Sequence, residues 1–202
     1  MTWRLRVTLV VGALGLGLAL VFFRPPPGSR PPLAVLGQLP PFDLVDERGA
    51  PFGVDSMTGH VTVVDFIFTR CASSCPRLTA HMGELQELLV RKKSAARLVS
   101  FSVDPDNDTP AVLSDYAAQA HADLSRWSFV TGPVQEIEHA AVGGFKVSVD
   151  KIVRDAGDYD VIHGEWFVLV DPSARLRGYY SVQEASDLGA LARDVQALEE
   201  PR

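Results

Sequence analysis

The run VTVVDFIF, Val61–Phe68, leads without a break into TRCASSCP, Thr69–Pro76, and this stretch decides the fold. The first half is apolar and rich in β-branched residues, which predicts a buried strand. Apolar residues at helical spacing over 78–89 then predict a helix. Both cysteines of the chain, Cys71 and Cys75, therefore fall on a turn between a strand and a helix.

This turn is suited to thiol chemistry. Four residues of separation can bring both sulfurs of Cys71 and Cys75 onto one side, where they can bridge or share a metal ion. A helix N-terminus favours thiolate over thiol, and Pro76 suits a first helical turn. Two soft thiolates suit Cu(I) or zinc better than magnesium or calcium. The alternative is a plain stabilising disulfide, which is disfavoured by the short loop and by the exposed position expected for such a turn.

The N-terminal segment predicts attachment to a membrane. Val7–Phe23 is apolar except for Thr8 and has arginines on both sides, as in a transmembrane helix or a signal peptide. No small-residue cleavage pattern follows, so we expect residues 1–24 to be an uncleaved anchor with its N-terminus in the cytoplasm. Residues 25–33 include five prolines and predict a semi-rigid stalk. Residues 34–202 then form one domain on the outer side of the membrane.

The charge of this domain narrows the choice of partners. All 25 acidic residues follow the stalk, together with 15 of the 19 lysines and arginines, which gives a formal charge of about −10. Nucleic acid is excluded as a partner because phosphates need a basic face. A protein that handles cations or docks on a basic patch tolerates such a charge.

The remaining segments complete an α/β pattern of the thioredoxin-like type. A β-hairpin over 41–54 precedes the first strand, and a second buried strand over 96–103 is expected parallel to it through a right-handed crossover. Thr109 and Pro110 predict the cap and first residue of the next helix. The later predicted elements are a strand at 127–130, a helix after 131–133, an alternating segment at 145–149 that is expected to pair locally, a hairpin of 165–170 with 176–180, and a helix at 183–198.

A third ligand for a metal would have to come from elsewhere in the chain. His163 lies in a predicted loop, 158–164, that feeds the strand 165–170, where thioredoxin-like folds bring a loop against the cysteine turn. Gly164 beside it allows close backbone approach. A lone histidine is more often structural or exposed, so both roles stay open at this point. Broad dithiol exchange is disfavoured because no proline lies between Pro133 and Pro172 to face the cysteines.

Several segments together resemble the Sco/SenC family of copper proteins, which take part in cytochrome c oxidase assembly. They are FIFTRC at 66–71, CP at 75–76, SVDP at 102–105 with DTP at 108–110, DY at 158–159 running to His163, and LVDP at 169–172. Two positions depart from the family pattern: Ala72 stands where many members have proline, and Ile162 where an acid often precedes the histidine. These departures bear on the affinity for copper and on its oxidation state.

The resemblance implies a thioredoxin-like fold in which Cys71, Cys75 and His163 bind one copper ion as Cu(I) or Cu(II). It further implies a single-pass protein of a bacterial inner membrane, with its soluble domain facing the periplasm or the cell exterior, which receives copper from an upstream donor. The copper would pass to the binuclear copper centre (CuA) of oxidase subunit II. The alternatives are a thiol-disulfide oxidoreductase with Cys71 and Cys75 as its redox pair, and a docking module with a structural disulfide. Asp104 and Asp108 are expected as turn and cap residues, or as carboxylates near the copper loop.

Overall fold

The computed structural model describes residues 32–71, 75–153, 159–163, 166–181 and 185–200. Of 149–153, 159–163 and 185–187 it describes the backbone alone. The predicted anchor, Val7–Phe23, lies outside the described residues. Within them, no helix has the length and apolar character needed to cross a membrane.

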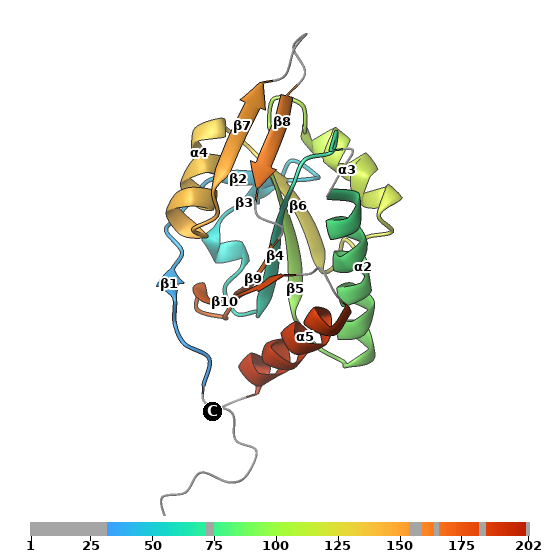
Figure 1. Ribbon diagram of the computed structural model, residues 1–202, viewed down its shortest axis with the longest axis vertical. Coiled ribbons are helices and arrows are strands. Elements are labelled where there is room, and N and C mark those ends of the chain that lie inside the picture. Colours follow the sequence, from blue (N-terminus) through green and yellow to red (C-terminus); the bar gives the residue numbers. More distant parts are fainter. Residues whose placement is uncertain (1–31, 72–74, 154–158, 164–165, 182–184, 201–202) are drawn as a thin grey trace, which may run out of the picture. The chain divides into compact units, whose positions relative to one another are not determined.

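A mixed sheet runs through the centre of the fold (Figure 1). In spatial order its strands are β1 (Gly37–Gln38), β10 (Arg175–Ser181), β9 (Trp166–Val170), β4 (Thr62–Ile67), β5 (Arg97–Ser102), β6 (Trp127–Thr131), β2 (Leu44–Asp46) and β3 (Pro51–Phe52). A separate two-stranded sheet pairs β7 (Val149–Val153) with β8 (Tyr159–His163). The helical elements are η1 (Val54–Ser56), α2 (Cys75–Arg91), α3 (Pro110–Gln119), α4 (Val134–Glu138), the π-helical turn η2 (His139–Gly144) and α5 (Ala185–Glu199).

The central unit β4–α2–β5 has the predicted topology. β4 and β5 are parallel, with Val64 opposite Val99, and β6 continues the parallel set beside β5. Every residue of β4 is buried, as expected for a strand covered on both faces. On its other side β4 pairs antiparallel with β9, with Val64 opposite Val168. The sheet therefore places the end of β4 next to the beginning of β9.

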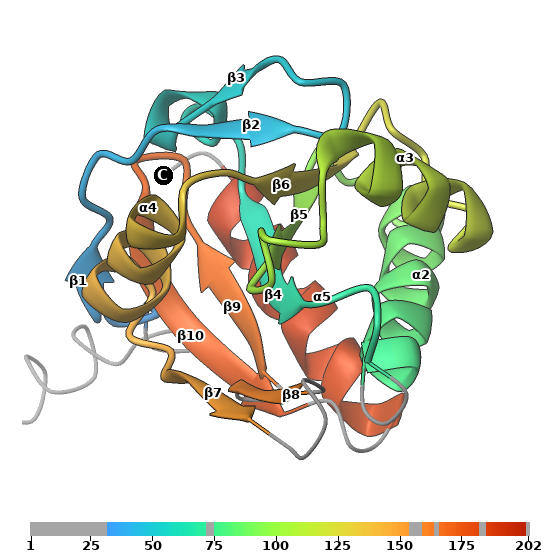
Figure 2. The same cartoon turned by 90° about the horizontal axis from the view of Figure 1, so that it is seen from above.

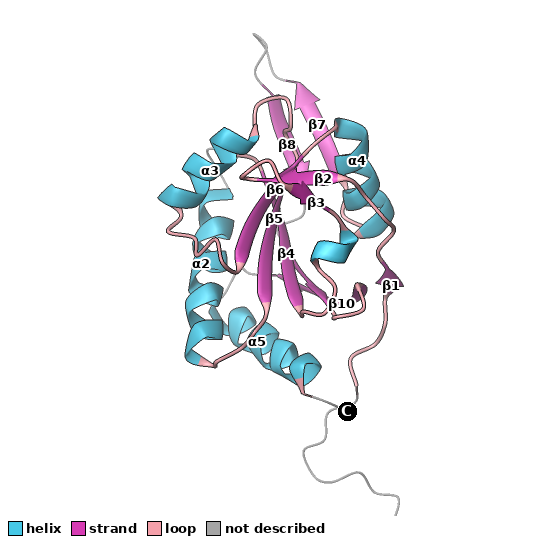
Figure 3. Ribbon diagram, turned by 180° about the vertical axis from the view of Figure 1, so that it is seen from behind, coloured by secondary structure: helices cyan, strands magenta, loops and turns pink. Residues whose placement is uncertain are grey.

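Helices cover both faces of the sheet. α2 and α5 lie on one face and α4 with η2 on the other (Figure 2). α3 runs beside α2 in both Figure 1 and Figure 3, and a 2.7 Å hydrogen bond between the hydroxyls of Thr79 and Tyr116 joins the two helices. α2 presents Leu78, Met82 and Leu85 to the core, which explains the apolar spacing of its sequence.

Most predicted elements are confirmed. β2 and β3 form the N-terminal hairpin, and β9 and β10 form the hairpin before the last helix. Thr109 caps α3 by accepting a hydrogen bond from the backbone N–H of Val112, with Pro110 as the first helical residue. The α/β pattern expected for a thioredoxin-like domain is thus present in the described residues.

Two predictions between α4 and β9 differ from the structure. The alternating segment 145–149, expected to pair locally, does so at Val149, the first residue of β7. Residues 145–148 are not strand, because Lys146 has a positive φ of 58° and Phe145 closes the π-helical turn. The alternation arises because Phe145 and Val147 are buried in the core. The predicted loop 158–164 is instead mostly strand β8, since Tyr159–His163 pairs with β7.

Candidate metal centre

The two cysteines lie on the strand-to-helix turn, as predicted. β4 ends at Ile67, and the backbone N–H of Cys71 donates to the carbonyl of Phe68 at 3.2 Å, which turns the chain. Cys75 is the first residue of α2. Its backbone N–H donates to Sγ of Cys71 at 3.3 Å, so one of the unpaired donors of the helix N-terminus is aimed at a sulfur. This contact favours a deprotonated sulfur, the form in which cysteine binds a metal.

Burial of the cysteines is greater than expected for an exposed turn. Cys71 is 8% exposed and Cys75 is fully buried, and no disulfide joins them. Burial raises the pKa of the Cys75 thiol, against a backbone hydrogen bond from Phe68 that lowers it. The prediction that the helix terminus favours a thiolate is therefore wrong for Cys75, because desolvation outweighs the dipole. A metal bound there would have to displace the proton.

The turn before Cys71 is held by carboxylates from the loop after β5. Asp108 is fully buried and accepts hydrogen bonds from the hydroxyl of Ser102 at 2.6 Å and from Thr69. Asp104 is also buried and bonds to Arg70 at 3.2 Å and to Asn107. Asp104 is thus a turn residue that also reaches the cysteine turn.

The expectation that Asp108 acts as a cap is wrong, because Thr109 caps α3. The side chain of Asp108 instead bonds across the fold to Thr69, two residues before Cys71. The sequence predicts a place near the copper loop for Asp108 only as the alternative to a turn or cap role.

A further acid, Asp65, lies within β4 and was missed in the sequence. It is fully buried, and within the described part of the chain neither carboxylate oxygen has a hydrogen-bond partner. Burial raises the pKa of Asp65 to about 7, although Ser100, opposite it on β5, lowers this pKa. A negative charge on Asp65 also contributes to the raised pKa of Cys75. The signal was available: VTVVDFIF has one charged residue in an otherwise apolar strand.

His163 is described by its backbone alone. It ends β8 opposite Val149, three residues before β9 begins at Trp166. Because β9 is antiparallel to β4, this part of the chain enters the sheet at the edge where β4 leaves it for Cys71. Among the residues whose side chains are described, no group of three or more His, Cys, Asp or Glu could hold a metal ion. The ligand role of His163 therefore stays a prediction.

Another histidine near the turn has a local partner. His81, on α2, lies 3.2 Å from the carboxylate of Glu84 through its Nδ1 atom. This i,i+3 pair lies along the surface of α2 and gives His81 a local partner on its own helix.

These features define a thioredoxin-like protein with a dithiol site. The strand β4 ends in a Cys-x₃-Cys turn, a helix starts at the second cysteine, and a β-hairpin and a helix close the fold. Residues 36–199 match the SCO1/SenC family, and the chain belongs to this family. A SCO1/SenC family lipoprotein from Bacillus anthracis is 34% identical, with a TM-score of 0.74 over 81% of this chain and 96% of that chain.

Two further solved structures are similar to this chain. BsSco, described as a member of the Sco family of cytochrome c oxidase assembly proteins with a disulfide switch, is 35% identical. Its TM-score is 0.72 over 82% of this chain and 96% of its own. Yeast Sco1 with copper bound is 25% identical, with a TM-score of 0.67 over 81% of this chain and 90% of that chain.

Proposed function

We propose that the protein is a copper chaperone that binds one copper ion through Cys71, Cys75 and His163. The observation that carries the proposal is the 3.3 Å approach of the Cys75 backbone N–H to Sγ of Cys71, which places the sulfur of Cys71 against the residue that carries the second soft donor, at the start of α2. The sheet register supports His163 as the third donor, because β9 begins at the edge where β4 ends. Copper in yeast Sco1 supports the choice of metal.

Burial of the sulfurs suggests the order of ligand exchange. Cys75 is fully buried, whereas Cys71 lines an open hollow between α2 and α3. An incoming ligand would reach the metal from the side of Cys71, so Cys71 would be exchanged before Cys75. Stepwise exchange passes the ion on without releasing it into solution. We propose the binuclear copper centre of cytochrome c oxidase subunit II as the acceptor, in line with the assembly role given for BsSco.

Membrane attachment through residues 1–24, with residues 34–202 on the periplasmic side, is part of the same proposal. The relative from Bacillus anthracis is a lipoprotein, which supports a position at a membrane. In this chain both cysteines lie at the proposed copper site, and the apolar run Val7–Phe23 is therefore our candidate for the anchor.

Thiol-disulfide exchange is a second candidate function. The same contact places Cys71 and Cys75 next to each other, as a redox pair would require, and a disulfide switch is described for BsSco. A dithiol that reduces the cysteines of subunit II would prepare the acceptor for copper. The two functions differ in their need for His163.

Titration of the reduced full-length protein with Cu(I) against a competing chelator tests the proposal. We expect tight one-to-one binding that is lost in Cys71→Ser and Cys75→Ser and weakened about 100-fold or more in His163→Ala. His60→Ala is the matched control, since His60 lies before β4 and away from the cysteine turn in sequence, and it should bind copper as the wild type does. Copper binding that is indifferent to His163 would move the function to thiol exchange.

A further inference from the structure

A hollow of about 630 Å³ lies between α2 and α3 and opens at one end onto Cys71. Small residues on the two helices leave this space: Ala80 and Gly83 on α2, and Ala120 after α3. The hydroxyls of Thr79 and Tyr116 bond to each other within it. This groove has room for an extended segment of another protein, which would pass Cys71.

The groove carries negative charge. Glu84 and Glu87 line it from α2, with side chains 59% and 73% exposed. Among the described residues that line it there is no lysine or arginine. Arg91 pairs with Glu87 at 3.4 Å, but both side chains are exposed, so solvent screens this pair and it is easily exchanged for another cation.

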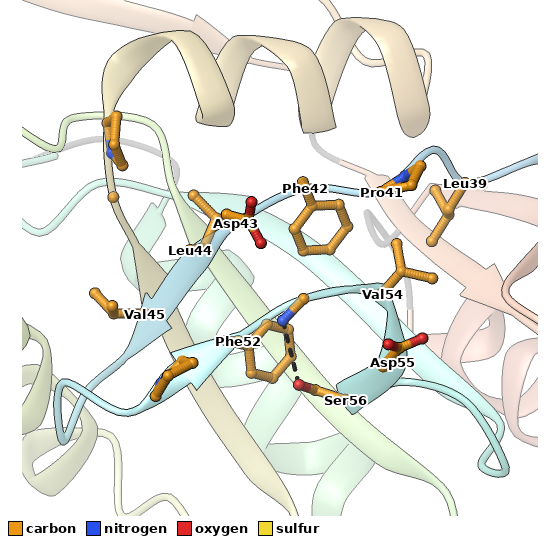
Figure 4. Close-up of a pocket in the computed structure, with 14 residues that line it drawn as sticks. Leu39, Pro41, Phe42, Asp43, Leu44, Val45, Phe52, Val54, Asp55 and Ser56 are labelled. Atoms are coloured by element: carbon orange, nitrogen blue, oxygen red, sulfur yellow. Dashed lines mark hydrogen bonds between the residues drawn. The ribbon is translucent and has the colours of Figure 1, made fainter.

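A second hollow offers a comparison. It has a volume of about 750 Å³ and lies at β2, β3 and η1, with Asp43 and Asp55 among the side chains that line it (Figure 4). β2 and β3 are at the far edge of the sheet from β4, beyond β5 and β6, and no cysteine lines this hollow. Size and acidic residues are thus shared by the two hollows, but only the groove between α2 and α3 adjoins a proposed copper ligand.

We propose that the groove between α2 and α3 is the docking surface for the copper acceptor, and that the acceptor enters it with a basic segment beside its own copper ligands. This inference rests on the proposed function. An acceptor must bring a ligand atom to the side of Cys71, and the groove leads there. Carboxylates along the approach attract lysine and arginine, which speeds association and fixes the orientation of the partner.

Association is measured with the copper-free soluble domain of oxidase subunit II as the probe and the reduced, copper-free full-length protein as its partner. We expect the double variant Glu84→Lys with Glu87→Lys to weaken association about tenfold or more at low salt. The matched control, Asp43→Lys with Asp55→Lys, changes the net charge equally at the other hollow and should bind as the wild type does. Wild-type association should weaken as salt rises, and the groove variant should lose this dependence.

A neutral variant separates shape from charge. A Cβ atom added to Gly83 meets no other atom within 4 Å, so Gly83→Gln fills the groove without disturbing the helix. It should weaken association about tenfold at all salt concentrations while the stability of the protein is kept. The docking proposal would be overturned if the groove double variant and the control double variant weakened association equally. It would also be overturned if the wild-type protein did not associate with the probe.

Copper affinity, measured separately on each variant, tests the proposed function. Unchanged copper binding with groove-independent association would leave the chaperone proposal standing and remove the docking surface. If association depends on the groove but the protein binds no copper, the docking surface stands and the chaperone proposal falls.

Discussion

The carboxylate of Asp108 accepts two hydrogen bonds from Thr69, one from the hydroxyl at 2.5 Å and one from the backbone N–H at 3.1 Å. Thr69 is two residues before Cys71, and Asp108 lies 39 residues further along the chain. A buried acceptor with ordered donors on both sides fixes the backbone of the cysteine turn. The position of Cys71 therefore depends on a side chain that is not at the site.

Loss of this carboxylate should affect both stability and copper affinity. In Asp108→Ala, the donors of Thr69 and Ser102 lose their acceptor, so we expect the free energy of unfolding to fall by about 3 kcal/mol. Copper affinity should fall about tenfold because the Cys71 turn loosens. Denaturant unfolding and chelator competition measure the two effects. Asp106→Ala, an exposed position on the same loop, is the control, and equal effects of the two substitutions would refute the positioning role.

The two cysteines should differ in reactivity. Burial raises the pKa of the Cys75 thiol, and Cys71 alone lines the groove, so alkylation of the reduced protein should be at least about tenfold faster at Cys71. Iodoacetamide labelling of Cys75→Ser and Cys71→Ser, followed by mass spectrometry, gives the two rates. In denaturant the rates should become similar. Equal rates in the native protein would show that burial does not separate them.

Asp65 should make stability depend on pH. Because burial raises its pKa to about 7 from an unfolded value of 3.8, folding favours the protonated acid. The stability that protonation gives is full below pH 3.8, and it is lost as pH rises to about 7. Asp65→Asn removes this dependence, so relative to wild type its free energy of unfolding should gain roughly 3 kcal/mol between pH 4 and pH 7.

Urea unfolding of both proteins across this pH range measures the difference. Asp43→Asn, at an exposed position, should track the wild type at every pH. A constant difference between Asp65→Asn and wild type would mean that Asp65 is ionised in the folded state throughout.

The end of α2 offers a stabilising substitution. Lys93 has a positive φ of 56°, its N–H donates to the carbonyl of Val90, and the N–H of Ser94 donates to Leu89, which is the Schellman pattern. Glycine adopts this conformation without the steric penalty, so Lys93→Gly should raise the free energy of unfolding by about 1 kcal/mol. Thermal unfolding measures the change. Lys92→Gly should destabilise instead, because Lys92 bonds to Gln196 on α5.

The secondary structure around the cysteine turn can be predicted from local sequence patterns. The strand β4, the helix α2 and the position of both cysteines between them follow from apolar spacing and a proline at the helix start, which are signals within one short stretch. These local signals predict an exposed turn, but Cys75 is buried, because burial depends on which distant residues pack over the turn. They also gave Asp108 a local role, since its partner Thr69 is distant in sequence.

The segment that contains His163 forms a strand that its local sequence does not predict. The sequence predicts 158–164 as the loop that feeds the strand 165–170, yet Tyr159–His163 forms β8 through pairing with β7. Strand pairing supplies hydrogen bonds that no single strand has alone, so a weak pattern can become a strand once a partner is present.

The sequence by itself determined the α/β class, the β4–α2–β5 unit, the placement of Cys71 and Cys75 at a helix start and the acidity of the domain. These depend on residue type and on spacing along the chain. The tertiary structure alone decided that Cys75 is buried, that Asp108 holds Thr69, that Asp65 is fully buried within β4 and that Cys71 lines a groove. The physical reason is that desolvation and long-range hydrogen bonds arise only when the sheet register brings distant segments together.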